Sequence, residues 1–155
     1  MSSLRKCILV ASFTALLASV GFTQEKQIRR SELPAAVQKT VNSEARSATI
    51  RGFAQEKENG KTYYEAELMV NGHSKDVLMD GDGAVVEVEE QVAVGSLPAN
   101  VREGLQAKAG SGKLVKAESL TKKGKLVAYE AQVSTNGKKS EVQVGPDGKS
   151  LDHEE

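Results

Sequence analysis

Hydrophobic positions recur along the chain with two different spacings. Between residues 33 and 45 they fall four apart, and the same spacing returns between residues 97 and 109. Side chains four apart lie on one side of a helix, so each stretch predicts a helix of about three to four turns. The two stripes are Leu33, Val37, Val41 and Ala45, and Leu97, Val101, Leu105 and Ala109. Pro34 and Pro98 are expected at the first helical position, where a missing N–H leaves no hydrogen bond unmade.

After each predicted helix, hydrophobic and polar residues alternate. Tyr64, Ala66, Leu68 and Val70 alternate with Glu65, Glu67 and Met69. Such a strand packs one face and exposes the other mostly to solvent. The dipeptide Asn71-Gly72 is typical of a type I′ hairpin turn, because both residues tolerate positive φ. Further strands are expected at residues 49–56, 77–79 and 86–88, and at residues 113–121, 142–144 and 151–153.

The chain also repeats itself. Leu33-Pro34-Ala35-Ala36-Val37 returns as Leu97-Pro98-Ala99-Asn100-Val101, and Tyr64-Glu65-Ala66-Glu67-Leu68 returns as Tyr129-Glu130-Ala131-Gln132-Val133. Matches in this order predict a tandem duplication. The expected fold class is therefore α+β, with two tandem modules, each one helix packed on a three- to four-stranded antiparallel meander sheet. The modules are expected at residues 33–90 and 97–155, with residues 91–96 as a linker.

These motifs resemble those of the PepSY-like family, which is also described as beta-lactamase-inhibitor-like. The resemblance rests on the Leu-Pro-Ala-Ala-Val helix start, the strand motif at Gly60–Glu67 and the Asp-Gly-x-Val-Val motif at residues 82–86. It covers nearly all of residues 33–155, once per repeat. It implies an exported bacterial protein, in a family of which some members bind or restrain other proteins outside the cytoplasm. It implies no catalytic residues.

The first residues have the order of features typical of a secretory signal peptide. Arg5 and Lys6 precede an uncharged, mostly apolar run of 14 residues from Cys7 to Val20, and small residues follow. A membrane-spanning helix needs roughly 20 apolar residues. A signal peptide over residues 1–23 is therefore favoured over a membrane anchor or a buried helix. The mature protein is expected to be exported, periplasmic or extracellular, with no stable membrane span and no cysteine.

The charges balance over the chain but are distributed unevenly. Residues 33–90 hold 6 basic and 11 acidic residues, whereas residues 97–155 hold 10 basic and 8 acidic residues. This composition does not resemble the basic footprint of a nucleic-acid-binding protein, so no nucleic-acid partner is expected. One interpretation of the uneven charge is solubility and protection of sheet edges. The other is a dipolar molecule that steers a partner with complementary patches.

Motifs that would carry catalysis or metal binding are absent from the sequence. His73 and His153 are flanked by neither a Gly-x-Ser-x-Gly nor a His-Glu-x-x-His sequence, so no catalytic residue, cofactor or metal is expected and the protein is not expected to be an enzyme. Asp80, Asp82 and Glu89 have part of the spacing of a calcium loop. Leu78 stands where the first ligand belongs, however, and Asp-Gly pairs equally suit a tight turn.

The solvent side of one predicted strand is the expected partner surface. Its residues are Tyr63, Glu65, Glu67 and Met69, with Asp76 on the neighbouring strand. A tyrosine and a methionine among carboxylates are residue types that protein interfaces use, although ordinary solvent-side strand residues would give the same pattern.

The leading interpretation is thus an exported, non-catalytic module, periplasmic or secreted, that binds or inhibits another exported protein. The alternative is an envelope protein that binds a small ligand or a cation through the acidic first module. The sequence leaves the oligomeric state open.

Overall fold

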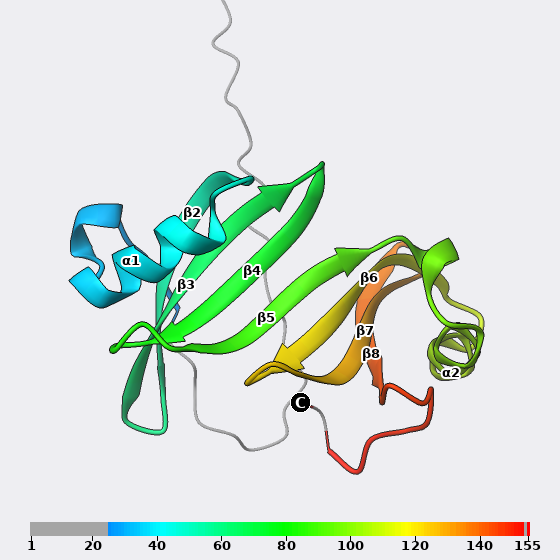
Figure 1. The fold of residues 1–155 in the computed structure, drawn as a ribbon. Coiled ribbons are helices and arrows are strands. Elements are labelled where there is room, and N and C mark those ends of the chain that lie inside the picture. The colour runs from blue at the N-terminus through cyan, green and yellow to red at the C-terminus, as the bar shows by residue number, and fades with distance from the viewer. Residues whose placement is uncertain (1–24, 154) are drawn as a thin grey trace, which may run out of the picture.

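The computed structural model describes residues 25–153 and residue 155 (Figure 1). The predicted signal peptide, residues 1–23, lies outside the described residues. The elements follow one another as β1 (Lys26–Gln27), η1 (Arg30–Glu32), α1 (Ala35–Glu44), β2 (Thr49–Glu58), β3 (Lys61–Val70), β4 (His73–Asp80), β5 (Val85–Val92), η2 (Val94–Ser96), α2 (Ala99–Ala109), β6 (Lys113–Lys122), β7 (Lys125–Thr135) and β8 (Lys138–Val144).

The strands form one antiparallel sheet of 8 strands, ordered in space as they occur along the chain. Tight turns set the register between neighbours that follow directly along the chain, β2 to β5 and β6 to β8. At the turn from β3 to β4, Asn71 and Gly72 have φ angles of 50° and 86°, which confirms the positive φ predicted for both residues of a type I′ turn. Such a turn matches the twist of the strands that it joins, so the register follows from local sequence.

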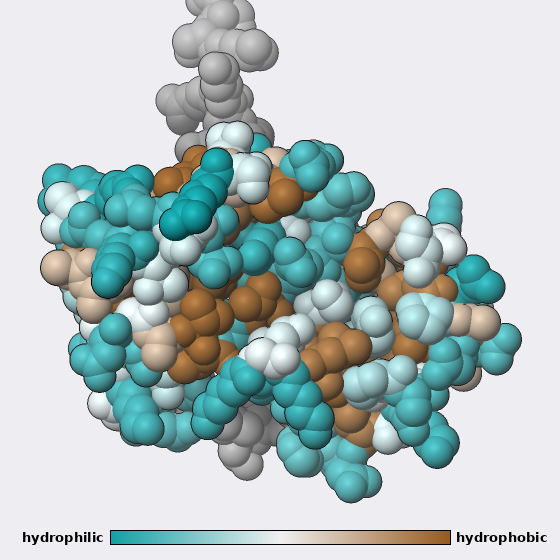
Figure 2. Space-filling view, in the orientation of Figure 1, coloured by the Kyte–Doolittle hydropathy of each residue, from teal (hydrophilic) through white to brown (hydrophobic). Residues whose placement is uncertain are grey.

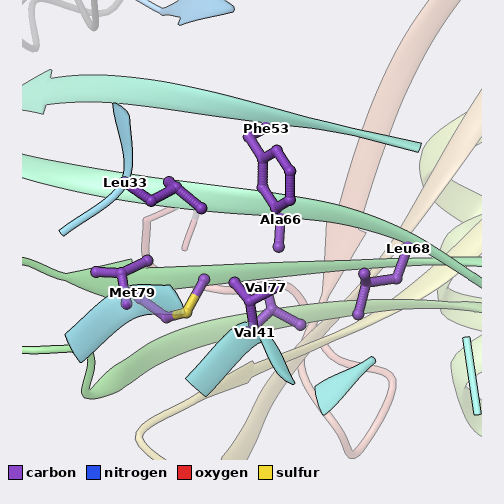
Figure 3. Packing of buried hydrophobic residues seen from close by; sticks show 8 residues of the cluster. Leu33, Val41, Phe53, Ala66, Leu68, Val77 and Met79 are labelled. Atoms are coloured by element: carbon purple, nitrogen blue, oxygen red, sulfur yellow. The ribbon is translucent and has the colours of Figure 1, made fainter. Parts of the chain in front are cut away.

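Each helix packs on its own part of the sheet (Figure 1). Val37 and Val41 of α1 are fully buried in a cluster with side chains from β2, β3 and β4, and Figure 3 shows these side chains meeting the helix. Val101 and Leu105 of α2 are fully buried in a second cluster, with side chains from β6, β7 and β8. Both predicted stripes are therefore confirmed as the faces that pack on the sheet.

A glycine in a turn contacts the first turn of each helix. Gly83 has a φ of 78°, and a Cβ there would lie 2.6 Å from the carbonyl oxygen of Ala36. Gly148 also has a φ of 78°, and a Cβ there would overlap the carbonyl of Asn100. Only glycine combines this conformation with so close an approach of two backbones. The two repeated Asp-Gly turns thus help to seat the two helices.

The prediction of two tandem modules, each with its own small sheet, is wrong. Strand β5 pairs with β6 from Glu87↔Lys122 to Val92↔Ala117, so the two halves share one continuous sheet. Two separate sheets would leave the N–H and C=O groups of two more strand edges unpaired, and pairing β5 with β6 satisfies them. The segment expected as a linker begins with the last residues of β5 and continues into η2.

Two smaller expectations about element boundaries also differ from the structure. Pro34 and Pro98 are N-cap residues, one position before the helices begin. The strand expected at residues 151–153 is absent there. After β8 the chain turns instead, with the N–H of Gly145 donating to the carbonyl of Lys149 at 2.8 Å. The contact of this turn with α2 diverts the chain away from the sheet.

The two helix stripes give a first prediction. Val37→Asp or Val101→Asp would place an unpaired carboxylate in a fully buried position, and each should lower the free energy of unfolding by more than about 3 kcal/mol. Val115→Asp is the matched control, because the Val115 side chain is 46% exposed. Chemical denaturation followed by circular dichroism measures all three. A Val37→Asp protein as stable as the Val115→Asp protein would show that α1 does not pack as described.

Candidate functional site

Both helices lie on the same face of the sheet. Residues directly opposite each other in an antiparallel pair share a face. Val77, in the first core, lies opposite Val88 of β5, while Val92 of β5 lies opposite Ala117, in the second core. Val88 and Val92 are four residues apart on one strand and therefore point to the same side. We call the opposite side, formed by the alternate residues of each strand, the helix-free face.

Carboxylates cross the helix-free face from strand to strand. They include Glu56 on β2, Glu65 and Glu67 on β3, Asp76 on β4, Glu87 and Glu89 on β5, Glu118 on β6 and Glu130 on β7. Glu67, Asp76 and Glu89 lie directly opposite one another on three successive strands. Like charges in such pairs repel, so they cannot all ionise without cost.

Burial keeps two of these groups, Glu65 and Glu89, protonated at neutral pH. Burial, with added repulsion from Asp76 and Glu56, raises the pKa of Glu65 to about 9. Burial also raises the pKa of Glu89 to about 8, and the nearby charge of Glu118 adds to the effect. The pKa of Asp76 rises to about 6 for the same two reasons, burial first and Glu118 second. The charge of the face therefore changes across the neutral range.

Two lysines supply positive charge to the face. The Nζ of Lys116 lies 2.6 Å from an Oε of Glu118, and its charge acts to lower the pKa of Asp76. The Nζ of Lys122 lies 3.7 Å from Glu87 and 3.4 Å from Glu155. These ion pairs span neighbouring residues and strands, so they offset part of the repulsion among the carboxylates.

Asp76, Glu89 and Glu118 have oxygen atoms that all lie within 4.8 Å of one another, a spacing at which oxygens could hold a cation. The ammonium group of Lys116 is already paired with Glu118, so the chain itself brings a cation to this cluster. We therefore assign the cluster to the electrostatics of the sheet and do not assign it to a metal.

The residues with calcium-loop spacing do not come together as a loop would require. One Oδ of Asp80 accepts hydrogen bonds from the N–H groups of Asp82 and Ala84, each at 3.0 Å. Glu89 lies on β5 opposite Asp76, not Asp80. These contacts are those of a tight Asp-Gly turn.

The five residues predicted as partner contacts share the helix-free face. Tyr63, Glu65, Glu67 and Met69 lie on β3, and Asp76 lies on β4 directly opposite Glu67. All five are half-buried, although the alternating pattern predicts a mostly solvated side. The Nε2 of Gln27 on β1 donates to Glu67 at 3.1 Å, so the edge strand also contributes to this surface.

Sequence reasoning missed the carboxylates that continue the row into the second half. The alternation within residues 85–92 could have placed Glu87 and Glu89 on one face. No local signal shows, however, that β5 lies beside β6. The proximity of Glu89 and Glu118 follows only from that pairing.

The second half of the helix-free face is partly occupied by the end of the described chain. The N–H of Glu155 donates to the Oε1 of Gln143 at 3.0 Å, and its carboxylate pairs with Lys122. Leu120 and Ala128 are buried on this part of the face. The opposite, helix-bearing side has its hydrophobic surface broken into separate patches by polar side chains (Figure 2). The β3–β4 part of the helix-free face is therefore the best candidate surface.

Comparison with solved structures places this architecture among known proteins. A BLIP-like protein from Bacteroides fragilis is 19% identical, with a TM-score of 0.57 over 77% of this chain and 83% of that chain. A Bacteroides eggerthii protein, provisionally described as periplasmic, is 20% identical, with a TM-score of 0.63 over 77% and 86%. A DUF2874 family protein from Bacteroides ovatus is 20% identical, with a TM-score of 0.60 over 77% and 84%.

The chain shares its fold with these three proteins. At this level of identity the likeness concerns the fold alone. No protein-family model matches the sequence, and no curated protein matches it either. Membership of the PepSY-like family and descent from two tandem copies therefore stay predictions from the sequence.

The buried carboxyl of Glu65 gives a prediction about pH. Its folded pKa lies above its ordinary value of 4.5, so its contribution to stability is fully present below about pH 4.5 and is lost as pH rises toward about 9. Glu65→Gln cannot ionise. It should match the wild type near pH 4.5 and exceed it at pH 9 by at least about 1 kcal/mol, since one pKa unit corresponds to about 1.4 kcal/mol.

Urea denaturation at a series of pH values measures this difference. Glu103→Gln is the matched control, because Glu103 is an exposed carboxylate on α2. Its stability should follow the pH profile of the wild type. Parallel profiles for wild type and Glu65→Gln would contradict the raised pKa.

Proposed function

We propose that this protein is an exported, non-catalytic binding protein that engages another exported protein through its helix-free face. The observation that carries the proposal is the β3–β4 part of this face. There Tyr63, Met69 and a set of carboxylates lie together on a sheet surface that no helix of the described chain covers. The partner contacts that we propose are Tyr63, Glu65, Glu67, Met69 and Asp76.

The comparisons support export. The similar proteins include one described as BLIP-like and one provisionally described as periplasmic. The signal-like order of residues 1–23 agrees with export. Neither helix among the described residues is long and apolar enough to cross a membrane.

The chemistry of the surface favours a protein partner with a basic patch. Tyr63 and Met69 are residue types that anchor interfaces, because tyrosine offers a large, rigid surface with a polar end and methionine a flexible apolar side chain that adapts to its neighbour. Glu67 and Asp76 surround them with negative charge, whereas Glu65 is protonated at neutral pH. Complementary charge steers association and selects partners more than it adds affinity.

The two histidines give little support for catalysis. His73 is exposed at the start of β4. His153 is also exposed, with its Nε2 3.9 Å from an Oε of Glu155. A hydrolytic triad needs a nucleophile, a base and an orienting acid in mutual contact. A binding role therefore fits the described residues better than an enzymatic one.

Removal of the carboxylates tests the proposal. Exported proteins captured on immobilised mature protein would be identified and purified, and association would then be followed by surface plasmon resonance. Glu65→Gln/Glu67→Gln/Asp76→Asn should associate about tenfold more slowly at low salt, with a flatter salt dependence. Its stability should be unchanged or slightly higher, because mutual repulsion is removed.

Glu103→Gln/Asp152→Asn is the control, since it removes exposed carboxylates that do not lie on the strands of the sheet. It should associate at the rate of the wild type. If the triple variant associated as fast as the wild type at low salt, the five residues would be ordinary solvent-side strand residues and not partner contacts. Failure to recover any reproducible partner at micromolar bait would count against the binding role itself.

A further inference from the structure

The two halves of the molecule meet at a single strand pairing, which we call the seam. It joins Glu87–Val92 of β5 to Ala117–Lys122 of β6. Figure 1 shows α1 and α2 on separate parts of the sheet, with this pairing between them. The first core ends at Val88, while Val92 packs on the second core. Among the described residues, no side chain belongs to both clusters, so no shared hydrophobic core holds the halves together.

Polar groups lie on both faces of the seam, beside Val88 and Val92 on the helix-bearing face and the buried Leu120 on the helix-free face. On the helix-bearing face, the Ser119 hydroxyl donates to the backbone oxygen of Glu90 at 3.4 Å, and Thr121 lies opposite Val88. On the helix-free face, Glu89 and Glu118 stand on the two seam strands themselves, and their oxygens lie within 4.8 Å of each other. Backbone hydrogen bonds and the electrostatics of these side chains therefore both act on the pairing.

The charged groups around Asp76 come from three other strands. Glu67 faces it from β3 and Glu89 faces it from β5. Glu118 and Lys116 face it from β6, the first raising and the second lowering its pKa. Around Asp76, one positively charged lysine thus faces three neighbouring carboxyl groups.

Around Glu89 the neighbours are acidic as well. Glu118 on β6, Glu130 on β7, Glu87 on its own strand and Asp76 on β4 all act to raise its pKa. Lys122 supports the seam by pairing with Glu87 at 3.7 Å, but it also pairs with Glu155. The balance at the seam is repulsive once Asp76 and Glu89 are both ionised.

We propose that the seam is a pH-sensitive junction: ionisation of Asp76 and Glu89 beside Glu118 loosens the β5–β6 pairing, while each half keeps its own helix and core. The direction of the pH effect on this pairing follows from the linkage between opening and proton binding. Opening exposes these carboxyls to water, where the pKa of each returns toward its ordinary value, so opening releases protons and is favoured as pH rises. The effect should level off above about pH 8, where Glu89 is ionised in the closed seam too.

Hydrogen exchange of the full-length mature protein tests the seam. Protection factors, corrected for the intrinsic exchange rate at each pH, would be measured by NMR between pH 5.5 and pH 8.5. Amides that donate across the β5–β6 pairing should lose protection by up to about tenfold for each pH unit, because each released proton contributes that factor. Amides that donate across β3–β4 and β6–β7 should keep their protection, since each half stays folded.

Asp76→Asn/Glu89→Gln should make seam protection independent of pH, and Glu103→Gln should behave as the wild type. Far-UV circular dichroism checks that the double variant is folded. The pH series on the wild type tests the proposal even if the double variant does not fold. Constant seam protection across the pH range would overturn the proposal. An equal loss of amide protection in all strand pairs would also overturn it, because such a loss would indicate global unfolding. Both measurements are independent of any partner, so failure here leaves the proposed binding function untouched.

Discussion

The pairing of β5 with β6 is the constraint on which the rest of this structure depends. Each half could bury its own helix stripe on a few strands, but the strands at its edges would then leave backbone groups unpaired. Pairing the two edges gives one sheet of 8 strands. Both helices consequently cover one face, and the other face runs without interruption from one half into the next.

The electrostatic character of the molecule follows from that same pairing. On separate modules, Glu89 and Glu118 would stand on two different sheet edges with free access to water. In one sheet they are neighbours at the junction, with Asp76 beside them. Their burial and proximity raise the pKa values of Asp76 and Glu89 into the neutral range. The charge on this surface is therefore a property of the assembled sheet more than of either half.

Function and stability place opposing demands on the helix-free face. A partner with a basic patch would be attracted by carboxylates held close together, and those carboxylates repel one another until such a partner arrives. Proteins commonly keep groups at binding surfaces that lower their own stability. The half-buried position of Tyr63 and Met69 fits the same interpretation, because a surface that is already partly ordered loses less entropy on binding.

The sequence by itself determined the parts of this protein that depend on local physics. Stripes with a period of four defined the packed faces of both helices, because a helix brings residues four apart to one side. The Asn71-Gly72 turn defined a hairpin, because its positive φ values suit few other residues. The placement of Tyr63, Glu65, Glu67 and Met69 on one side of a strand also followed from alternation alone.

Only the tertiary structure decided how the halves combine, which side of the sheet stays free of helices and which carboxylates become neighbours. Edge strands offer the same backbone groups whatever their side chains, so nothing local in β5 or β6 specifies the other as its partner. The pKa values of Glu65, Glu89 and Asp76 depend in turn on burial and on charges from distant parts of the chain. These are long-range quantities, and they exist only once the sheet has formed.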